Sequence, residues 1–171
     1  MNRTTGWTLF SAVGVFLLTG CLLTNTDPPA RQIPLTVLFK STQCGTRAPG
    51  LSAEWIHRPE QVTALTGGAA VAKSNETPLW DPAKEGALWI QMGQQRTGGF
   101  HLELDQPTAA LKNGVATIIL RRVTPGANMF TTQALTAPCL LLKMSKVGVE
   151  TVDLRDQEGA QLAIVTIPAD H

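Results

Sequence analysis

The chain has 171 residues, of which 43% are hydrophobic, 16% are charged and 5% are aromatic. This length suits one globular domain, and the charge content is too low for a coiled coil. Lys and Arg number 14 against 13 Asp and Glu, a net charge of +1 that excludes the basic footprint of nucleic-acid-binding proteins. The 15 Gly and 11 Pro favour a turn-rich, mainly β fold.

The N-terminal segment is typical of a secretory signal. Trp7–Leu18 is largely apolar but shorter than the ~20 residues that a membrane-spanning helix needs. Leu18-Thr19-Gly20-Cys21 resembles the lipobox of bacterial lipoproteins, in which the Cys is acylated and becomes the first residue after cleavage. The alternative is a soluble secreted protein with an ordinary cleavage site and a chance Cys.

The lipobox resemblance implies three parts of the chain. They are a signal peptide over residues 1–20, a lipidated Cys21 with a flexible tether over 21–33, and a β domain over 34–171. Because Leu and not Asp follows Cys21, the resemblance favours the outer membrane, with the protein anchored by its lipid on the periplasmic side.

The first half of the domain contains few clear elements. Leu35–Lys40 is rich in β formers and is predicted to be a strand. Ser52–Glu54 is predicted to open a short turn, and Pro59–Leu65 to form a short helix that ends before Gly67. Residues 68–86 are predicted to cross the surface.

From residue 87 onward the pattern is strongly β. Strands are predicted over residues 87–92, 100–105, 115–123, 133–143 with a break at Pro138, 147–154 and 161–167, the last two as a hairpin. Phe100, Leu102 and Leu104 alternate and should share a core face, and Asn113-Gly114 predicts a tight turn. The chain should therefore fold as an antiparallel β-sandwich or barrel-like sheet with one or two short helices.

Two cysteines remain outside the lipidation site, Cys44 and Cys139. An even number in an oxidising compartment favours a disulfide between them. A catalytic Cys is the alternative, but no His stands in a family signature around either residue. Neither a Cys-x-x-Cys nor a His-x-x-x-His spacing occurs, so no metal and no cofactor are expected.

Two motifs resemble those of PrcB-like domains. Ile90–Leu104 contains a strand, the loop Gly-x-x-x-Thr-Gly-Gly-aromatic and an alternating strand. Arg122–Gly126, followed by Gln133–Lys143, is similar to the family's Pro-Gly turn and its Leu-Thr-Ser-Pro-aromatic segment. The sequence departs from the family at Arg96, where Pro is common, and at Cys139, where an aromatic residue is usual.

The archetype of this family is a lipoprotein subunit that stabilises a secreted protease complex. The resemblance thus implies a non-catalytic domain that binds another envelope protein, a protease among the candidates. The residues expected to contact the partner are Gly93, Gln95, Arg96, Thr97, Gly98, Gly99, Phe100, Thr136 and Pro138. In the simpler alternative, Gly98 and Gly99 only supply positive φ for a tight connection.

Two further functions stay open. The loop Gln95–Phe100 is similar to the Asn-Pro-Thr-Thr-Gly-aromatic loop of chagasin-like inhibitors, which implies a protease inhibitor. A structural envelope lipoprotein without a dedicated loop function is the other alternative.

Catalytic patterns are weak. His101, Glu103 and Asp105 share one strand face and could bind a metal or form a dyad, but a solvated polar face is the expected explanation. Gly-x-Ser-x-Gly and phosphate-binding motifs do not occur, which disfavours an enzyme. Trp89 is expected in the core, and Trp80 at a surface contact or as a loop plug.

Overall fold

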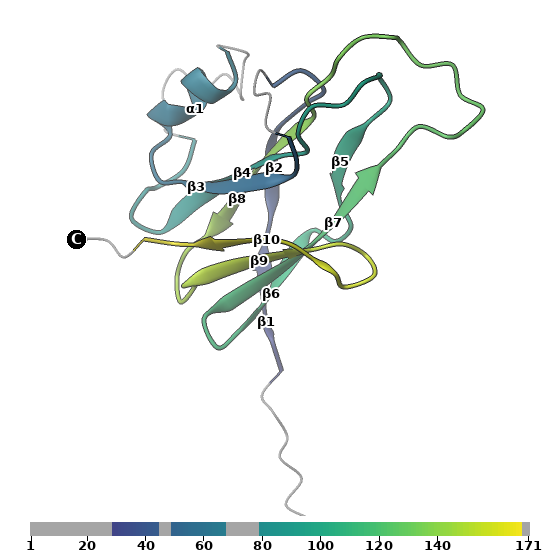
Figure 1. The fold of residues 1–171 in the computed structure, drawn as a ribbon. Coiled ribbons are helices and arrows are strands. Elements are labelled where there is room, and N and C mark those ends of the chain that lie inside the picture. Colours follow the sequence, from purple (N-terminus) through teal and green to yellow (C-terminus); the bar gives the residue numbers. More distant parts are fainter. Residues whose placement is uncertain (1–28, 45–48, 68–78, 169–171) are drawn as a thin grey trace, which may run out of the picture.

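The computed structural model describes residues 29–44, 49–67 and 79–168. The predicted signal peptide, Cys21 and the tether as far as residue 28 lie outside the described residues. Within them the chain forms strands β1 to β10 and one short helix, α1 (Figure 1). None of the described helical residues forms a segment long and apolar enough to cross a membrane.

The elements follow the chain in simple order. They are β1 (Arg31–Pro34), β2 (Thr36–Ser41), β3 (Ser52–Ile56), α1 (Glu60–Leu65), β4 (Glu85–Gln91), β5 (His101–Leu104), β6 (Thr108–Lys112), β7 (Val115–Val123), β8 (Cys139–Ser145), β9 (Thr151–Arg155) and β10 (Gln161–Thr166).

The strands form two sheets that pack against each other (Figure 1). One has the order β1-β6-β7-β9-β10, with β5 paired to the end of β7, and the other has the order β2-β8-β4-β3. The strand pairs are antiparallel except β7 with β9, which is parallel. This confirms the mainly β prediction and gives a sandwich-like architecture in place of a closed barrel.

The core lies between the sheets and continues beneath the helix. In β4, Leu88 and Ile90 face the other sheet, whereas Trp89 faces α1 and packs near Val62. Strand β8 divides its side chains in the same way, so both central strands are buried on both faces. Trp89 is 2% exposed, which confirms its predicted place in the core.

Of the two places predicted for Trp80, the structure shows the buried one: the side chain fills the space beneath its loop and is not exposed at the surface. Its side chain is buried, and its Nε1 donates a hydrogen bond to the carbonyl oxygen of His57 at 3.1 Å. The predicted helix is also confirmed, with Pro59 before its first turn and Gly67 at φ +62 after its end.

Several predicted β elements are confirmed. Asn113 and Gly114 have φ values of 52° and 79°, as a tight hairpin between β6 and β7 requires. Strand β7 has the predicted bounds, and β9 and β10 form the predicted hairpin. Strand β8 begins directly after Pro138, which cannot donate to a sheet ladder, so residues 133–137 of the strand predicted over 133–143 lie outside it. Strand β9 likewise begins at Thr151 and not at residue 147 as predicted.

Three strands were not predicted. Strand β1 includes the last three residues of the predicted tether, pairs with β6 and buries Ile33. Strand β3 replaces the turn predicted at Ser52–Glu54 and pairs with β4, and β6 was not anticipated at all. β1 and β3 are sheet edges, so much of their order comes from their neighbours.

Candidate functional site

Two loops lie side by side at one end of the sandwich, beyond β5 and the end of β7 (Figure 1). One comprises residues 92–100, between β4 and β5, and the other residues 124–138, between β7 and β8. We refer to these two segments together as the loop arm. They contain the two motifs that resemble PrcB-like domains.

Hydrogen bonds join the two segments along much of their length. Gln95 and Thr136 exchange a pair of backbone bonds, N to O, at 2.8 and 3.0 Å. The Thr136 hydroxyl also donates to the carbonyl oxygen of Thr97 at 2.9 Å. Further out, the Gly98 amide donates to the carbonyl oxygen of Thr132 at 2.9 Å. The two motifs therefore build one unit.

The glycines of this loop have distinct structural tasks. Gly93 and Gly99 have φ values of 84° and 89°, a conformation that other residues rarely adopt. Gly98 is buried, and a Cβ at this position would lie 2.4 Å from the Thr132 hydroxyl oxygen. Gly98 thus permits the close approach of the second loop.

All nine residues expected to contact a partner lie in the loop arm, but their exposure differs. Arg96 and Gly99 are exposed, whereas Gln95, Thr97 and Phe100 are half-buried. The remaining four are buried, namely Gly93, Gly98, Thr136 and Pro138. In the free protein Gly98, Thr136 and Pro138 form hydrogen bonds between the two loops, and the exposed surface comes from other residues.

Sequence reasoning missed the most exposed apolar residues of the arm. Met129 is 66% exposed, Leu135 is 59% exposed, and Phe130 is as exposed as in an extended chain, at 107%. They lie in a stretch of Asn, Thr, Gln and Ala that lacks strand alternation. Large apolar residues in such a stretch are the signal that could have singled them out.

A disulfide closes the base of the arm. Cys44 and Cys139 are bonded, with Cα atoms 5.9 Å apart and a sequence separation of 95, which confirms the predicted pair. Next to it the Cys44 amide donates to the carbonyl oxygen of Ala137 at 3.0 Å, and Gln43 bridges to the same residue. The last residues of the arm are thereby fixed to the end of β2.

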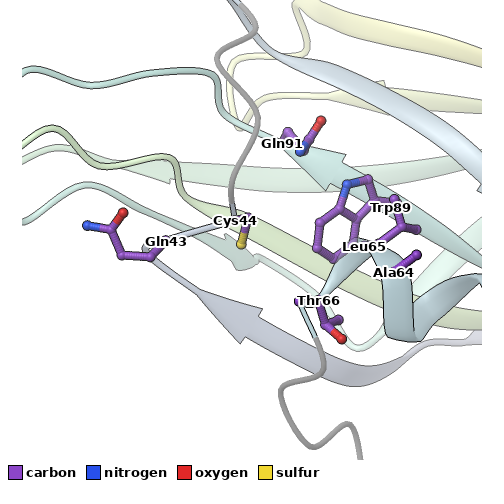
Figure 2. Close-up of a pocket in the computed structure, with 8 residues that line it drawn as sticks. Gln43, Cys44, Ala64, Leu65, Thr66, Trp89 and Gln91 are labelled. Carbon is purple, nitrogen blue, oxygen red and sulfur yellow. The ribbon is translucent and has the colours of Figure 1, made fainter.

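A pocket of about 320 Å³ opens beside this disulfide (Figure 2). Figure 2 shows the indole of Trp89 together with the polar ends of Gln43, Thr66 and Gln91. The described lining residues offer apolar contact and hydrogen bonds, and none of them is an acid or a base.

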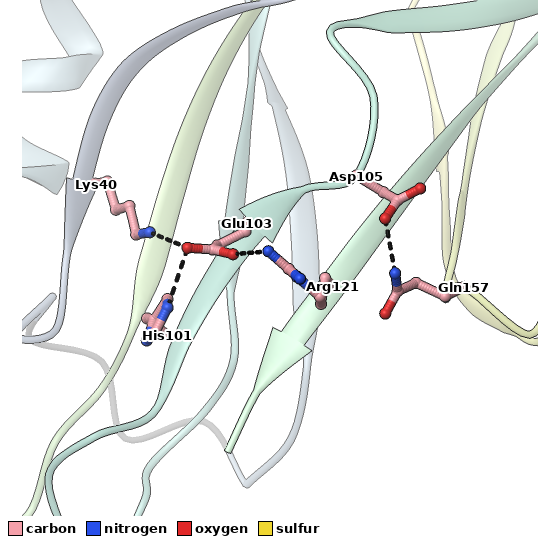
Figure 3. Close-up of polar contacts among 6 residues, drawn as sticks. All are labelled: Lys40, His101, Glu103, Asp105, Arg121 and Gln157. Atoms are coloured by element: carbon pink, nitrogen blue, oxygen red, sulfur yellow. Dashed lines mark hydrogen bonds and ion pairs between the residues drawn. The ribbon is translucent and has the colours of Figure 1, made fainter. Parts of the chain in front are cut away.

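The polar strand face of β5 is an ion-pair network (Figure 3). Glu103 accepts hydrogen bonds from Arg121 and, at 3.3 Å, from Lys40, and His101 Nε2 lies 3.1 Å from the same carboxylate. The hydrogen bond from Arg121, followed by that from Lys40, lowers the pKa of the Glu103 carboxyl below its ordinary value.

Asp105, predicted on the same strand face, lies just beyond the end of β5 and is separate from this network. Its carboxylate accepts a hydrogen bond from the Gln157 amide at 2.7 Å (Figure 3). In the part of the chain that the structure describes, no group of three or more His, Cys, Asp or Glu is placed to hold a metal ion.

Comparison with known proteins points to the same region. No curated protein and no solved structure gave a significant match. Residues 87–145 match the family model of the PrcB C-terminal domain, a region that runs from β4 to the end of β8 and contains both loops of the arm. The chain therefore carries a PrcB-like domain over residues 87–145, as its two motifs had predicted.

Proposed function

We propose that this protein is a lipid-anchored component of the bacterial envelope whose PrcB-like domain binds another envelope protein through the loop arm. The PrcB family suggests a subunit associated with a protease complex, so a protease or a component of its assembly is the first partner class to examine. The action is recognition and stabilisation of a folded partner, without bond-making chemistry.

The observation that carries this proposal is the mutual pairing of the two motif loops. Gln95 with Thr136, and Gly98 with Thr132, use backbone bonds to hold the loops in one shape before any partner arrives. A preformed surface loses little conformational entropy on binding, so more of the contact energy appears as affinity.

The position of the arm is compatible with lipid anchoring. The lipobox ends at Cys21, and the described chain enters the fold at β1, at the opposite end of the molecule from the arm (Figure 1). A chain tethered through its N-terminus can therefore direct the arm away from the membrane, toward other envelope proteins.

The geometry favours this function over a chagasin-type inhibitor. An inhibitory loop must enter a protease cleft by itself. Here Gly98 is buried under Thr132, so the segment of residues 92–100 is covered along one side by the second loop. A surface made of two loops is better suited to bind the open face of a partner than to enter a narrow cleft.

The test is capture of a partner by the tagged full chain, crosslinked in its own bacterium and purified. Gly98→Ala places a methyl group against the Thr132 hydroxyl, so it should separate the loops and lower partner recovery about tenfold or more. Adding Thr132→Ala removes that hydroxyl and should restore recovery.

Gly50→Ala is the matched control, since Gly50 lies outside the loop arm and a Cβ there has no atom within 4 Å, so recovery should be unchanged. The thermal midpoint of each variant shows whether the domain stays folded. The proposal is wrong if the wild-type chain recovers no specific partner.

A further inference from the structure

Phe130 has an environment unlike that of the other described aromatic residues. Trp80 and Trp89 are buried, and the remaining aromatic side chains of the described segments are at least half-buried, whereas Phe130 is fully exposed. The adjacent Met129 amide donates to the carbonyl oxygen of Gly126 at 3.0 Å, and after this turn both apolar side chains are exposed. Paired exposed side chains of this size are typical of interface anchors.

The loop arm also has a defined charge. Its two segments, residues 92–100 and 124–138, contain one charged residue, Arg96. Arg96 is exposed, and its side chain has no hydrogen bond or ion pair with any described residue, whereas Arg121 and Arg155 are each paired with a carboxylate. A free guanidinium suits bidentate binding of a carboxylate on another molecule.

These observations distinguish between the molecules that could cover the arm. A lipid surface is disfavoured because the arm lies at the end of the molecule opposite β1, where the chain leaves toward its N-terminus (Figure 1). A two-fold contact with a second copy would bring two Arg96 side chains to one interface, where the arm offers no carboxylate to pair them. A folded protein other than this chain can approach the arm away from β1 and can supply a carboxylate for Arg96, so it is the favoured occupant.

We infer that Phe130 anchors the loop arm in an apolar pocket of a folded partner protein, and that Arg96 pairs with a carboxylate beside that pocket. This inference rests on the proposed binding function and adds to it the anchor residue and the chemistry of the partner's surface. Leu135 and Met129 extend the apolar contact around Phe130.

The experiment introduces the photo-crosslinker p-benzoylphenylalanine at position 130 of the full chain, in its own bacterium. The crosslinked partner peptide is then mapped by mass spectrometry, and it should contain apolar residues with an Asp or Glu close by in the partner. Phe130→Ser and Arg96→Glu, tested without the photo-crosslinker, should each lower recovery of the same partner about tenfold. Rising salt should weaken the wild-type complex, and Arg96→Gln, which removes the charge, should reduce this dependence.

Matched controls come from elsewhere on the surface. Ile164 on β10 is 57% exposed, and Arg58 precedes α1 as an exposed cation. Ile164→Ser and Arg58→Glu should leave recovery unchanged. Sedimentation of the purified chain tests whether a second copy covers the loop arm. Flotation with phosphatidylethanolamine–phosphatidylglycerol vesicles tests whether a lipid surface does.

The outcomes separate the inference from the proposed function. If Phe130→Ser keeps the wild-type complex intact while Gly98→Ala loses it, the anchor is wrong and the binding function stands. A dimer or vesicle binding that Phe130→Ser abolishes would overturn the inference in favour of a second copy or a lipid surface. If the wild-type chain forms no complex, the function itself fails.

Discussion

Gly86, in β4, lies against the indole ring of Trp55 on the neighbouring strand β3. A Cβ at position 86 would lie 2.2 Å from Cζ2 of Trp55 and 2.6 Å from Cε2, so it would overlap the atoms of the indole ring. Gly86→Ala should therefore lower the free energy of unfolding by about 1–3 kcal/mol, the usual cost of overpacking. Urea denaturation measures this change. Gly50→Ala adds a methyl group with no atom within 4 Å and should have little effect.

The carboxylate of Glu103 makes stability depend on pH. Its pKa is lowered in the folded state by the hydrogen bonds from Arg121 and Lys40, so it stabilises the fold above the ordinary Glu range and loses this effect as pH falls through the folded pKa. Glu103→Gln should thus cost less than about 1 kcal/mol at pH 7, since the pair is partly exposed.

This difference between wild type and Glu103→Gln should begin to shrink as the pH falls into the ordinary Glu range of about 4.3, where the carboxyl of the unfolded chain becomes protonated. It should disappear once the pH falls below the lowered pKa of the folded carboxyl. Urea denaturation at a series of pH values measures it. Glu158→Gln, at an exposed position in the β9–β10 turn, is the control. An unchanged difference across the whole range would contradict the ion-pair explanation.

Among the elements, the buried central strands β4 and β8 could be predicted from the sequence, whereas the edge strands β1 and β3 could not. Strands β4 and β8 are buried on both faces, so their apolar runs stand out from the chain around them. Strand β1 has one buried residue, Ile33, between exposed neighbours, and its order depends on pairing with β6. The residues of β1 alone contain no pattern that predicts this pairing.

In the loop arm, too, some features could be predicted from the sequence and others could not. The Thr-Gly-Gly and Leu-Thr-x-Pro motifs predicted both loops, because glycine and proline act through the backbone conformation of their own positions. These motifs do not predict the exposure of Phe130, because a large apolar residue is ordinarily assigned to the core. Only its place in a polar stretch without strand alternation could have indicated it. Its exposure follows from the course of residues 124–138 outside both sheets.

The disulfide couples two elements that are distant in the sequence. Replacing Cys44 and Cys139 together by Ser opens a link across 95 residues. The free energy of unfolding should fall by about 4 kcal/mol in the chain-entropy account of such links. Limited proteolysis should also cut residues 124–138 faster, because the base of the arm loses its covalent attachment to the end of β2.

Reduction of the wild-type chain should reproduce both changes of the double Ser variant, and its thermal midpoint should then match that of the variant. Wild type and variant should also respond differently to reductant, since only the wild type has a bond to lose. Equal proteolysis of the arm in oxidised wild type and in the variant would show that hydrogen bonds alone fix it.

At the scale of the whole molecule, the first strands join the two sheets. β1 belongs to the sheet of β6 and β7, and after the buried Leu35 the chain continues directly into β2 of the other sheet. The folded domain therefore includes residues that were predicted as tether. In a lipid-anchored chain the free tether would end near residue 30, and its reach would be about 10 Å shorter than a tether ending at residue 33.

Ile33→Ala tests whether β1 is part of the folded unit. Ile33 is 2% exposed within the core between the sheets, so its truncation should lower the free energy of unfolding by about 2–4 kcal/mol. If residues 31–34 acted as a free tether, the same change would have almost no effect. Ile164→Ala on β10, where the side chain is 57% exposed, removes the same three carbon atoms and should cost under about 1 kcal/mol. Chemical denaturation of the purified chain compares them. A lower stability of Ile33→Ala together with a single cooperative transition would show that β1 unfolds together with the two sheets.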